Sequence, residues 1–459
     1  MSTVSSAADA LRNILRDDQV LTEAEDLERY SHDDAEWAYY ALPLAVVLPE
    51  SNEDVSRVVK LAAKAGIHVI ARGAGTGLSG GANATALSVI LSVERMTTVM
   101  EINVAERYVV AQAGVINNEL REAVADEGLW YPPDPASYKI STIGGNAATN
   151  AGGLCCVKYG VTRDYVLGMT VVLADGEIVT LGHRTAKGVT GYDLAGLMIG
   201  SEGTLGIITE LTLRLLPLSG REQRAVIGYF PSLQSAGVAV AAVTAAGIIP
   251  SALELIDGMC LKAVDDWKEL GLPEGADTLL LATVDELGAT GEELADRLAG
   301  IFADAGSLDV QRGADAEIDD LFLARRLAYP ALERLGPVLT EDVCVPRAAV
   351  PEMLGRIQAT AQEHNVVIAN IAHAGDGNLH PLIIAPEGDD EVKSRAKLAF
   401  NTIIQDCIDL GGTVTGEHGV GLLKLDGARS ELGPRVLDLH HAIKDALDPR
   451  GILNPGKGF

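Results

Sequence analysis

The stretch RGAGTGLSGG, residues 72–81, decides which kind of nucleotide-binding fold this chain can have. Three of its glycines form the pattern G-x-G-x-x-G, which in a dinucleotide-binding unit has to follow a strand and open a helix. The strand IHVIAR (67–72) is present, but GANATALSVILSVERM (81–96) follows, and its β-branched, apolar run predicts a second strand. Because no helix N-terminus is left to hold a pyrophosphate, the context argues against a nicotinamide-binding fold.

The glycines of this loop still require a reason. Five glycines in ten residues allow positive φ angles and let several backbone N–H groups converge, which suits a phosphate without any helix. Two further loops, STIGGNAATNAGG (141–153) and GSEGTLGIIT (200–209), add small hydroxyl side chains. One such loop is usually structural, but three in one half of a chain favour a large phosphate-bearing cofactor.

Helices and strands alternate around these loops. Ser51 is placed to cap a helix with apolar residues on one face, and Gly66 is placed to end it. The segment VVLADGEIVTL (171–181) predicts a hairpin in which Asp175 and Gly176 form a two-residue turn.

The order of elements changes near Pro217. From there to about residue 312 the pattern is strand, helix, strand, repeated once after a short insertion. This order predicts a ferredoxin-like sheet with helices on one face. A long helix over residues 317–336 follows, and the last helix is expected to end at Asp448, before Pro449.

Composition limits the class of protein. A chain of 459 residues is expected to form two or three packed units, and its net charge of −28 argues against nucleic acid or an anionic membrane as a partner. The odd count of five cysteines, without C-x-x-C spacing, predicts reduced thiols. The first residues lack a basic start followed by an apolar core, and no run of about 18 apolar residues occurs, so we expect no secretory leader and a cytoplasmic protein without a transmembrane segment.

The segment HAGDGNLH (373–380) places two of the nine histidines around Gly-Asp-Gly. It is open to interpretation as a phosphate loop, a tight turn or the hinge between two metal ligands. With Asp376 and Gly377 as a two-residue turn, His373 pairs with His380 across a hairpin, with Cβ atoms about 4.5–5.5 Å apart on an apolar face. Such a pair taken alone more often packs than binds a metal.

Six motifs together resemble one family. In chain order they are RGAGTGLSGG (72–81), YPPDP (131–135), STIGGNAATNAGG (141–153), KYGVTRDYVLGMTVVLADGE (158–177), KGVTGYDLAGLMIGSEGTLGIIT (187–209) and NPGK (454–457). Their order and spacing resemble flavoproteins of the vanillyl-alcohol-oxidase type, in particular the glycolate oxidase subunit and D-lactate dehydrogenase group. The resemblance covers nearly the whole chain.

The resemblance implies an α+β fold with three parts. Residues 1–217 would form a two-lobed FAD-binding domain, and residues 218–425 a ferredoxin-like cap, or substrate domain, with a metal site. Residues 426–459 would form a helical C-terminal segment that returns to the FAD-binding domain.

FAD is the cofactor that the resemblance implies. Non-covalent binding is expected, because the first loop lacks the histidine through which some members attach FAD. The pyrophosphate would lie on the backbone N–H groups of that loop. The adenine and ribose would lie near Glu202, Gly206 and Ile207, and the isoalloxazine near Asn454. The residues expected to contact FAD are Arg72, Gly73, Ala74, Gly75, Thr76, Gly77, Leu78, Gly80, Pro133, Asp134, Ser141, Thr142, Gly144, Gly145, Asn146, Thr149, Gly152, Glu202, Gly206, Ile207 and Asn454.

The same resemblance gives the histidines a role. The turn GTVTGEHGVG (412–421) supplies Glu417 and His418. His373, His380 and Glu417 would bind a divalent ion, zinc or manganese, and His418 would act as the base. Two imidazoles and a carboxylate with open coordination positions suit such an ion.

Substrate binding is expected on the helix that contains FLARRLAYPAL (322–332). By resemblance Arg325, in preference to Arg326, would grip a substrate carboxylate, with Tyr329 as a weaker contact. Thr340 and Glu341 stand where relatives that oxidise dicarboxylic substrates carry a lysine, which weakens the hydroxyglutarate alternative.

We therefore expect FAD-dependent oxidation of a D-2-hydroxy acid of the D-lactate or glycolate class, by hydride transfer to flavin N5. A D-2-hydroxyglutarate or bulkier hydroxy-acid dehydrogenase is the alternative within this class. A metal-dependent hydrolase would leave the glycine loops unexplained, and a non-catalytic flavin-binding subunit would not need the histidines. The electron acceptor (a quinone, a cytochrome, an electron-transfer flavoprotein or oxygen) stays open, as does assembly into a homodimer or a larger complex.

Overall fold

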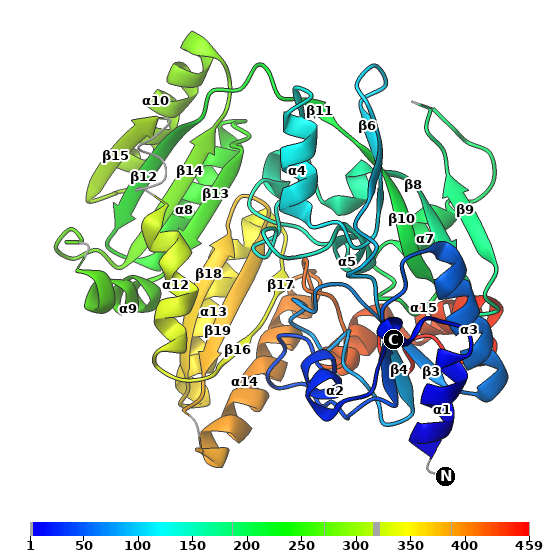
Figure 1. Ribbon diagram of the computed structural model, residues 1–459. Coiled ribbons are helices and arrows are strands. Elements are labelled where there is room, and N and C mark those ends of the chain that lie inside the picture. Colours follow the sequence, from blue (N-terminus) through cyan, green and yellow to red (C-terminus); the bar gives the residue numbers. More distant parts are fainter. Residues whose placement is uncertain (1–2, 186, 270, 315–321, 387, 459) are drawn as a thin grey trace. The chain divides into compact units, whose positions relative to one another are not determined.

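The computed structural model describes residues 3–185, 187–269, 271–314, 322–386 and 388–458. The chain divides into two compact units (Figure 1). The first consists of Met1–Gly152, Val161–Ser219 and Glu417–Phe459, and the second of Gly153–Gly160 and Gly220–Gly416.

The first unit contains two sheets. One has the strand order β1 (Val20–Leu21), β2 (Ala45–Val47), β4 (Ser88–Ser92) and β3 (His68–Arg72), with β2, β4 and β3 parallel. The other is antiparallel, in the order β5 (Val99–Asn103), β6 (Tyr108–Gln112), β10 (Ile207–Arg214), β8 (Val166–Val172) and β9 (Ile178–Gly182). A short ladder pairs β7 (Leu129–Trp130) with β11 (Leu216–Pro217).

The helices of this unit are α1 (Thr3–Arg12), α2 (Ala24–Tyr30), α3 (Asn52–Ala65), α4 (Asn117–Ala125), α5 (Ile143–Thr149), α7 (Leu194–Met198) and α15 (Leu425–Leu447). Two 3-10 turns, η1 (Asp17–Gln19) and η2 (Thr162–Tyr165), accompany them. Helix α3 has the predicted ends: Ser51 Oγ accepts the N–H of Asp54 at 3.2 Å, and Gly66 has φ +66°.

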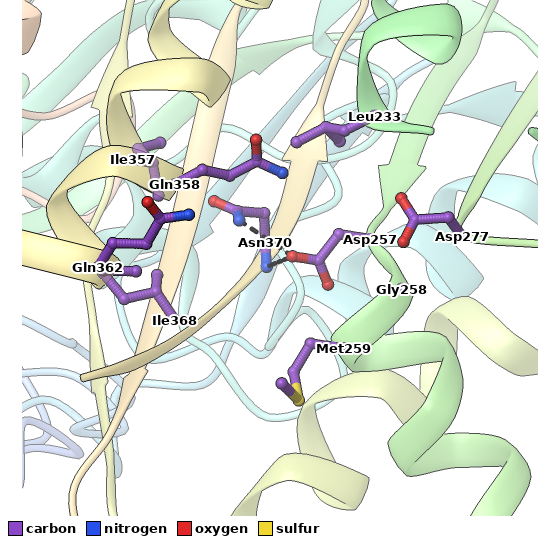
Figure 2. Close-up of a pocket in the computed structure, with 11 residues that line it drawn as sticks. Leu233, Asp257, Gly258, Met259, Asp277, Ile357, Gln358, Gln362, Ile368 and Asn370 are labelled. Carbon is purple, nitrogen blue, oxygen red and sulfur yellow. Dashed lines mark hydrogen bonds between the residues drawn. The ribbon is translucent and has the colours of Figure 1, made fainter. Parts of the chain in front are cut away.

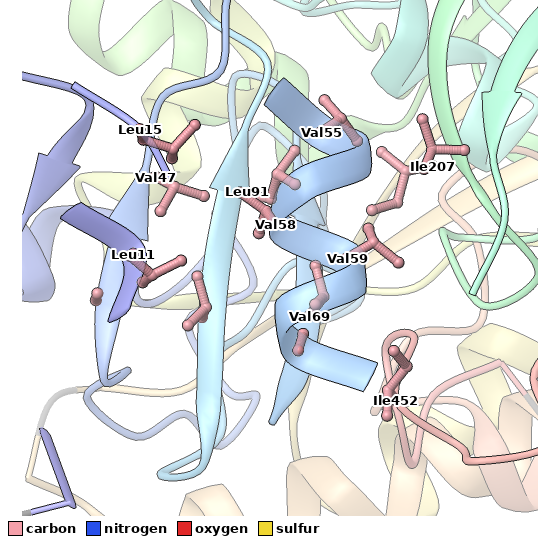
Figure 3. Close-up of a cluster of buried hydrophobic side chains, with 14 of the residues drawn as sticks. Leu11, Leu15, Val47, Val55, Val58, Val59, Val69, Leu91, Ile207 and Ile452 are labelled. Carbon is pink, nitrogen blue, oxygen red and sulfur yellow. The ribbon is translucent and has the colours of Figure 1, made fainter. Parts of the chain in front are cut away.

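The apolar face of α3 builds the core of the parallel sheet. Its buried Val55, Val58 and Val59 pack with Leu91 of β4 and with Ile452 of the C-terminal tail (Figure 3). The tail is thus part of this core, and its Leu453 is fully buried.

Residues 417–425 were expected in the cap domain but belong to the first unit. The N–H groups of Val420 and Gly421 donate to the Glu202 carboxylate, at 2.7 and 2.8 Å. The return to the first unit therefore begins at Glu417, and not at residue 426.

The segment Gly153–Gly160 was expected in the FAD-binding domain but belongs to the second unit. It contains α6 (Cys156–Tyr159), whose Lys158 and Tyr159 both bond to the buried Asp285, at 2.5 Å each. These charged bonds to a carboxylate that is almost inaccessible to solvent hold the segment there.

The second unit is built on one eight-stranded sheet. The strands β12 (Arg224–Phe230), β13 (Ala252–Ile256), β14 (Thr278–Val284) and β15 (Asp309–Ala314) lie in the ferredoxin-like order β15-β12-β14-β13. The sheet continues through β18 (Val367–His373), β19 (Asn378–Ile384) and β16 (Val338–Thr340), and β17 (Val343–Cys344) pairs with β19.

The helices of this unit cover both faces of the sheet, although the two from the predicted strand-helix-strand repeat contact each other, as expected for one face. They are α8 (Leu233–Ala245), α9 (Gly258–Lys268), α10 (Gly288–Asp304), α12 (Leu323–Glu333), α13 (Val350–Glu363) and α14 (Asp390–Asp409), with the 3-10 turn η4 (Arg347–Ala349). Helix α8 contacts α10 and α13. Helix α9 contacts α12 and packs with Leu279 and Leu281 of β14. The physical reason is that every residue of β14 is buried, so neither face of this apolar strand is left to solvent. The predicted helix over 317–336 is described only from residue 322, and its earlier residues lie outside the described part.

The hairpin at Asp175-Gly176 has a longer loop than predicted. Val172 pairs with Ile178, and the N–H of Leu173 donates to the Glu177 carbonyl at 2.9 Å, so three residues form the loop. A two-residue turn of the expected type needs positive φ at both residues, and of the two only Gly176 has it, at +81°.

Candidate functional site

The first two glycine loops lie against each other within the first unit. A methyl group on Gly73 would collide with Thr142 Oγ1, and one on Gly144 with Ala113. Gly75 and Gly80 have φ of +82° and +81°, a conformation that side chains rarely adopt. Glycine is therefore required here for close packing and for backbone conformation.

The third loop and the C-terminal tail meet the first loop. Asn454 Nδ2 donates to the carbonyl oxygens of Gly81 (2.9 Å) and Glu202 (2.6 Å). Asn454 and Glu202 were expected at opposite ends of FAD, but their direct bond rules that arrangement out. The carboxylate of Glu202 is enclosed, and burial raises its pKa.

The second loop shows features of a ligand site. Ser141 Oγ and Asn146 Nδ2 are buried and have no hydrogen-bond partner among the described residues. Buried polar atoms are nearly always paired, so a polar ligand fits these two positions. Thr142 and Thr149 are instead used locally, since Thr142 Oγ1 accepts the N–H of Gly145 (3.1 Å) and Thr149 Oγ1 donates to the Gly145 carbonyl (3.2 Å).

Several other residues expected to contact FAD make contacts within the protein itself. Ile207 is buried in the core of the parallel sheet, and a methyl group on Gly206 would meet Val171. The carbonyl of Pro133 accepts the Asn117 amide at 3.2 Å. The guanidinium of Arg72 folds over its own loop, where it donates to the His32 carbonyl at 2.6 Å.

The hairpin of HAGDGNLH does not have the predicted register. His373 pairs with Asn378, and His380 with Ile371, so the connection holds four residues instead of two. Gly377 has φ +93°, but Asp376 is not in the positive-φ region that a two-residue turn demands. The N–H groups of Asp376 and Gly377 both donate to the His373 carbonyl, at 3.2 Å each.

The two histidines nevertheless share one face, because a register shift of two residues conserves the face. Their rings are perpendicular, with centroids 5.1 Å apart. Ala369, Ile371 and Leu382, together with Ile384, form part of the apolar core on this face, as predicted.

A buried carboxylate stands behind each histidine. Glu254 Oε1 lies 2.7 Å from His373 Nδ1, and Asp342 Oδ1 lies 3.7 Å from His380 Nδ1. Because His373 Nδ1 is hydrogen-bonded to a carboxylate, coordination of an ion by His373 would use Nε2.

Glu254 also bonds to Arg325, whose Nε donates to Glu254 Oε2 at 2.9 Å. Burial raises the pKa of Glu254, but the charges and hydrogen bonds of His373 and Arg325 outweigh it and hold that pKa below its ordinary value. Glu254 was not among the site residues predicted from the sequence. The available signal was a single charged residue in the apolar strand PSALELI.

The two arginines of α12 differ in exposure. The Arg325 side chain is 17% exposed, whereas Arg326 lies on the solvent side of the helix. Tyr329, one turn after Arg325, lies on the same side, where Thr340 Oγ1 donates to its hydroxyl at 3.4 Å. The helix therefore turns Arg325 and Tyr329 toward the sheet.

Glu417 and His418 are the first residues of the returning segment of the first unit. His418 Nε2 lies 3.8 Å from Glu417 Oε1, and the His418 carbonyl accepts the Ser79 hydroxyl at 3.1 Å. Just before them, Thr415 of the second unit donates to Asp342 Oδ2 at 2.7 Å.

A cavity of about 380 Å³ opens elsewhere in the second unit (Figure 2). Asp257, Gln358 and Asn370 are among its lining residues. Asn370 lies on the face of β18 opposite His373, because side chains alternate along a strand. None of the predicted site residues lines this cavity, so it is distinct from the candidate site.

Two family models match the chain. The model described as an FAD binding domain matches residues 43–182, and the model described as the C-terminal domain of FAD linked oxidases matches residues 220–458. The second covers more than half of the sequence. The chain therefore belongs to the family of FAD-linked oxidases and is an FAD-linked oxidoreductase.

The family resemblance is confirmed by individual relatives. The chain is 40% identical to the glycolate oxidase subunit GlcD of Bacillus subtilis over 432 residues, which cover 94% of this chain and 92% of that protein. It is 37% identical to a D-lactate dehydrogenase of Anaerostipes hadrus, over 96% of this chain and 94% of that protein.

Solved structures confirm the expected fold. p-Cresol methylhydroxylase matches with a TM-score of 0.81 at 19% identity, and 4-ethylphenol oxidase from Gulosibacter chungangensis with 0.79 at 20%, each over 99% of this chain and 96% of the other. The fold is the α+β fold of the p-cresol methylhydroxylase and vanillyl-alcohol-oxidase type. Within the described residues, no helix combines the length and apolar character needed to cross a membrane.

Proposed function

We propose that the protein oxidises a D-2-hydroxy acid of the D-lactate or glycolate class to the 2-oxo acid. The observation that carries this proposal is the array Arg325–Glu254–His373, with His380 on the same face of the sheet. It combines a guanidinium suited to a carboxylate with imidazoles suited to an ion or a proton. The names of the relatives, glycolate oxidase subunit and D-lactate dehydrogenase, support this substrate class.

FAD would bind without a covalent bond along the three glycine loops. The unpartnered Ser141 and Asn146 atoms and the closely packed glycines support this placement. When bound, FAD supplies a hydride acceptor at its N5 atom.

Arg325 would hold the substrate carboxylate and so orient the hydroxyl-bearing carbon. Tyr329 would contact the substrate from the same helix. A fixed guanidinium fork gives both charge and direction, which a freely mobile lysine would not.

His373, His380 and Glu417 would hold a divalent ion, zinc or manganese. Chain connectivity supports Glu417 as the third ligand: Thr415 is anchored to Asp342, and two residues span at most about 7 Å. Such an ion would supply a Lewis acid for the substrate hydroxyl.

His418 would accept the hydroxyl proton, because an imidazole has a pKa suited to that role near neutral pH. We predict that His418→Ala lowers turnover by about 10²–10⁴-fold and leaves the flavin absorbance of the purified protein unchanged. His364→Ala is the control, since His364 bonds to Thr402 at 3.1 Å and has no assigned role. Unchanged turnover in His418→Ala contradicts its role as base.

An anaerobic absorbance spectrum tests the whole proposal. The purified protein is expected to show a flavin band that D-lactate or glycolate bleaches, and a chelator is expected to prevent the bleaching. A flavin band that neither acid bleaches would refute this substrate class. If bleaching persists after a chelator has removed all metal, as metal analysis would show, the role of the ion is refuted.

A further inference from the structure

Glu254 lies in the middle of the second unit's sheet with its side chain fully buried. A carboxylate in such a place is strongly destabilising unless it is paired and hydrogen-bonded. Each of its oxygens has a different charged or polar partner: Oε2 accepts from Arg325 at 2.9 Å, and Oε1 lies 2.7 Å from His373 Nδ1.

Regular structure fixes this arrangement. Glu254 stands directly opposite His373 in the ladder between β13 and β18. Arg325 comes from α12, which packs on the same face of the sheet. Groups held on strands and helices are placed more accurately than groups on loops.

Both bonds have chemical consequences. When His373 Nδ1 carries the proton and donates it in a hydrogen bond to Glu254, the lone pair of the neutral ring is on Nε2. In this tautomer Nε2 can bind a metal ion. The bond from Arg325 uses Nε and leaves recognition of a carboxylate to the two Nη nitrogens.

We propose that Glu254 is a positioning residue that sets the His373 tautomer and the Arg325 orientation together. It thereby couples binding of the ion to binding of the substrate carboxylate. This inference rests on the proposed function, since it assigns His373 to the ion and Arg325 to the substrate.

The test compares Glu254→Gln with Asp257→Asn in the FAD-loaded protein. Asp257 is a matched control: it is also a buried carboxylate at the end of β13, and it accepts the N–H and the side-chain amide of Asn370 on the same neighbouring strand, at 2.7 and 3.0 Å. Zinc and manganese affinities are measured by competition with a chromogenic chelator, and KM is measured with D-lactate and glycolate.

Glu254→Gln is expected to bind the ion about 10–100-fold more weakly, the usual effect of removing the carboxylate behind a ligating histidine. Its KM is expected to rise as well, while Asp257→Asn keeps both values. Glu254→Asp, which conserves the charge, is expected to recover part of the metal affinity.

Three results would overturn the inference. They are an unchanged metal affinity in Glu254→Gln, an equal loss in Asp257→Asn, and no recovery in Glu254→Asp. If the wild type binds neither ion, the metal assignment of the proposed function is wrong, and an unchanged KM in Glu254→Gln would then refute the inference separately.

A measurement on the wild type covers the case in which the variants do not fold. Nitrogen-15 NMR of histidine-labelled protein is expected to show the His373 ring protonated at Nδ1, and loss of the signal in His373→Gln assigns it. A ring protonated at Nε2 alone would overturn the inference.

Discussion

At the scale of single residues, adjacent positions on one helix have different chemical roles. Arg325 and Arg326 have the same side chain, but Arg325 donates to the buried carboxylate of Glu254, whereas Arg326 is exposed. The 3.6-residue period of the helix turns neighbouring positions by about 100°, which is enough to separate the two environments.

Arg325→Lys tests the proposed role of Arg325 in binding the substrate carboxylate. Lysine keeps the charge but loses the planar fork, so we expect KM for D-lactate or glycolate to rise on the order of tenfold or more. Arg326→Lys is the matched control and should change KM by less than about twofold, as surface substitutions do. Steady-state kinetics measures both, and equal KM values in the two variants would contradict the assignment.

At the scale of elements, both Asp-Gly turns were predicted to be shorter than they are. In each case glycine adopts positive φ and the aspartate before it does not. Asp376 Oδ1 instead accepts the N–H of Asn378 at 3.2 Å, a local bond that stabilises a longer turn. Turn length sets strand register, so the pairing of His373 changed with it.

Gly377→Ala tests the importance of this turn. Gly377 has φ +93°, and a methyl group there would collide with the Val345 carbonyl oxygen. We expect the substitution to lower the free energy of unfolding by roughly 1–3 kcal/mol and to weaken binding of the ion that we propose for His373 and His380.

Gly300→Ala in α10 is the control for Gly377→Ala. Apart from its chain neighbours and the backbone of its own helix, no described atom lies within 4 Å of the added methyl group, and alanine favours a helix interior over glycine by roughly 1 kcal/mol. Urea unfolding is expected to show opposite shifts for the two variants. A Gly377→Ala midpoint equal to or above the wild type would contradict the strain argument.

At the scale of the molecule, charged residues from both ends of the chain lie close together in the first unit, Asp33 near the N-terminus and Lys457 near the C-terminus. Lys457 is buried and donates to the Asn83 carbonyl and to Asn454 Oδ1. Burial lowers the pKa of Lys457 to about 8, and the nearby Asp33 and Glu202 carboxylates limit this fall.

The Lys457 pKa predicts a pH dependence of stability. A base with a lowered pKa holds its proton less well in the folded than in the unfolded state. Between about pH 8 and the ordinary value of 10.5 the unfolded chain therefore keeps a proton that the folded chain has lost. The free energy of unfolding increases with rising pH in this window.

Comparison of wild type with Lys457→Met isolates this contribution. The difference in unfolding free energy, wild type minus variant, is expected to be constant below pH 8 and to rise toward pH 10.5. Urea titrations at several pH values measure it. A difference that stays flat or falls across this window would contradict the proposed protonation change.

The sequence alone determined the family, the helix between Ser51 and Gly66, the ferredoxin-like strand order and the face that His373 and His380 share. Helix caps and hydrophobic periodicity depend on a few neighbouring residues, and a glycine-rich motif is itself a run of neighbouring residues. Both can therefore be recognised without a structure. The tertiary structure alone decided the hairpin register, the helices on both sheet faces and the bond of His373 to Glu254. That bond joins positions 119 residues apart, and only the pairing of β13 with β18 brings a charge in an apolar strand opposite a histidine.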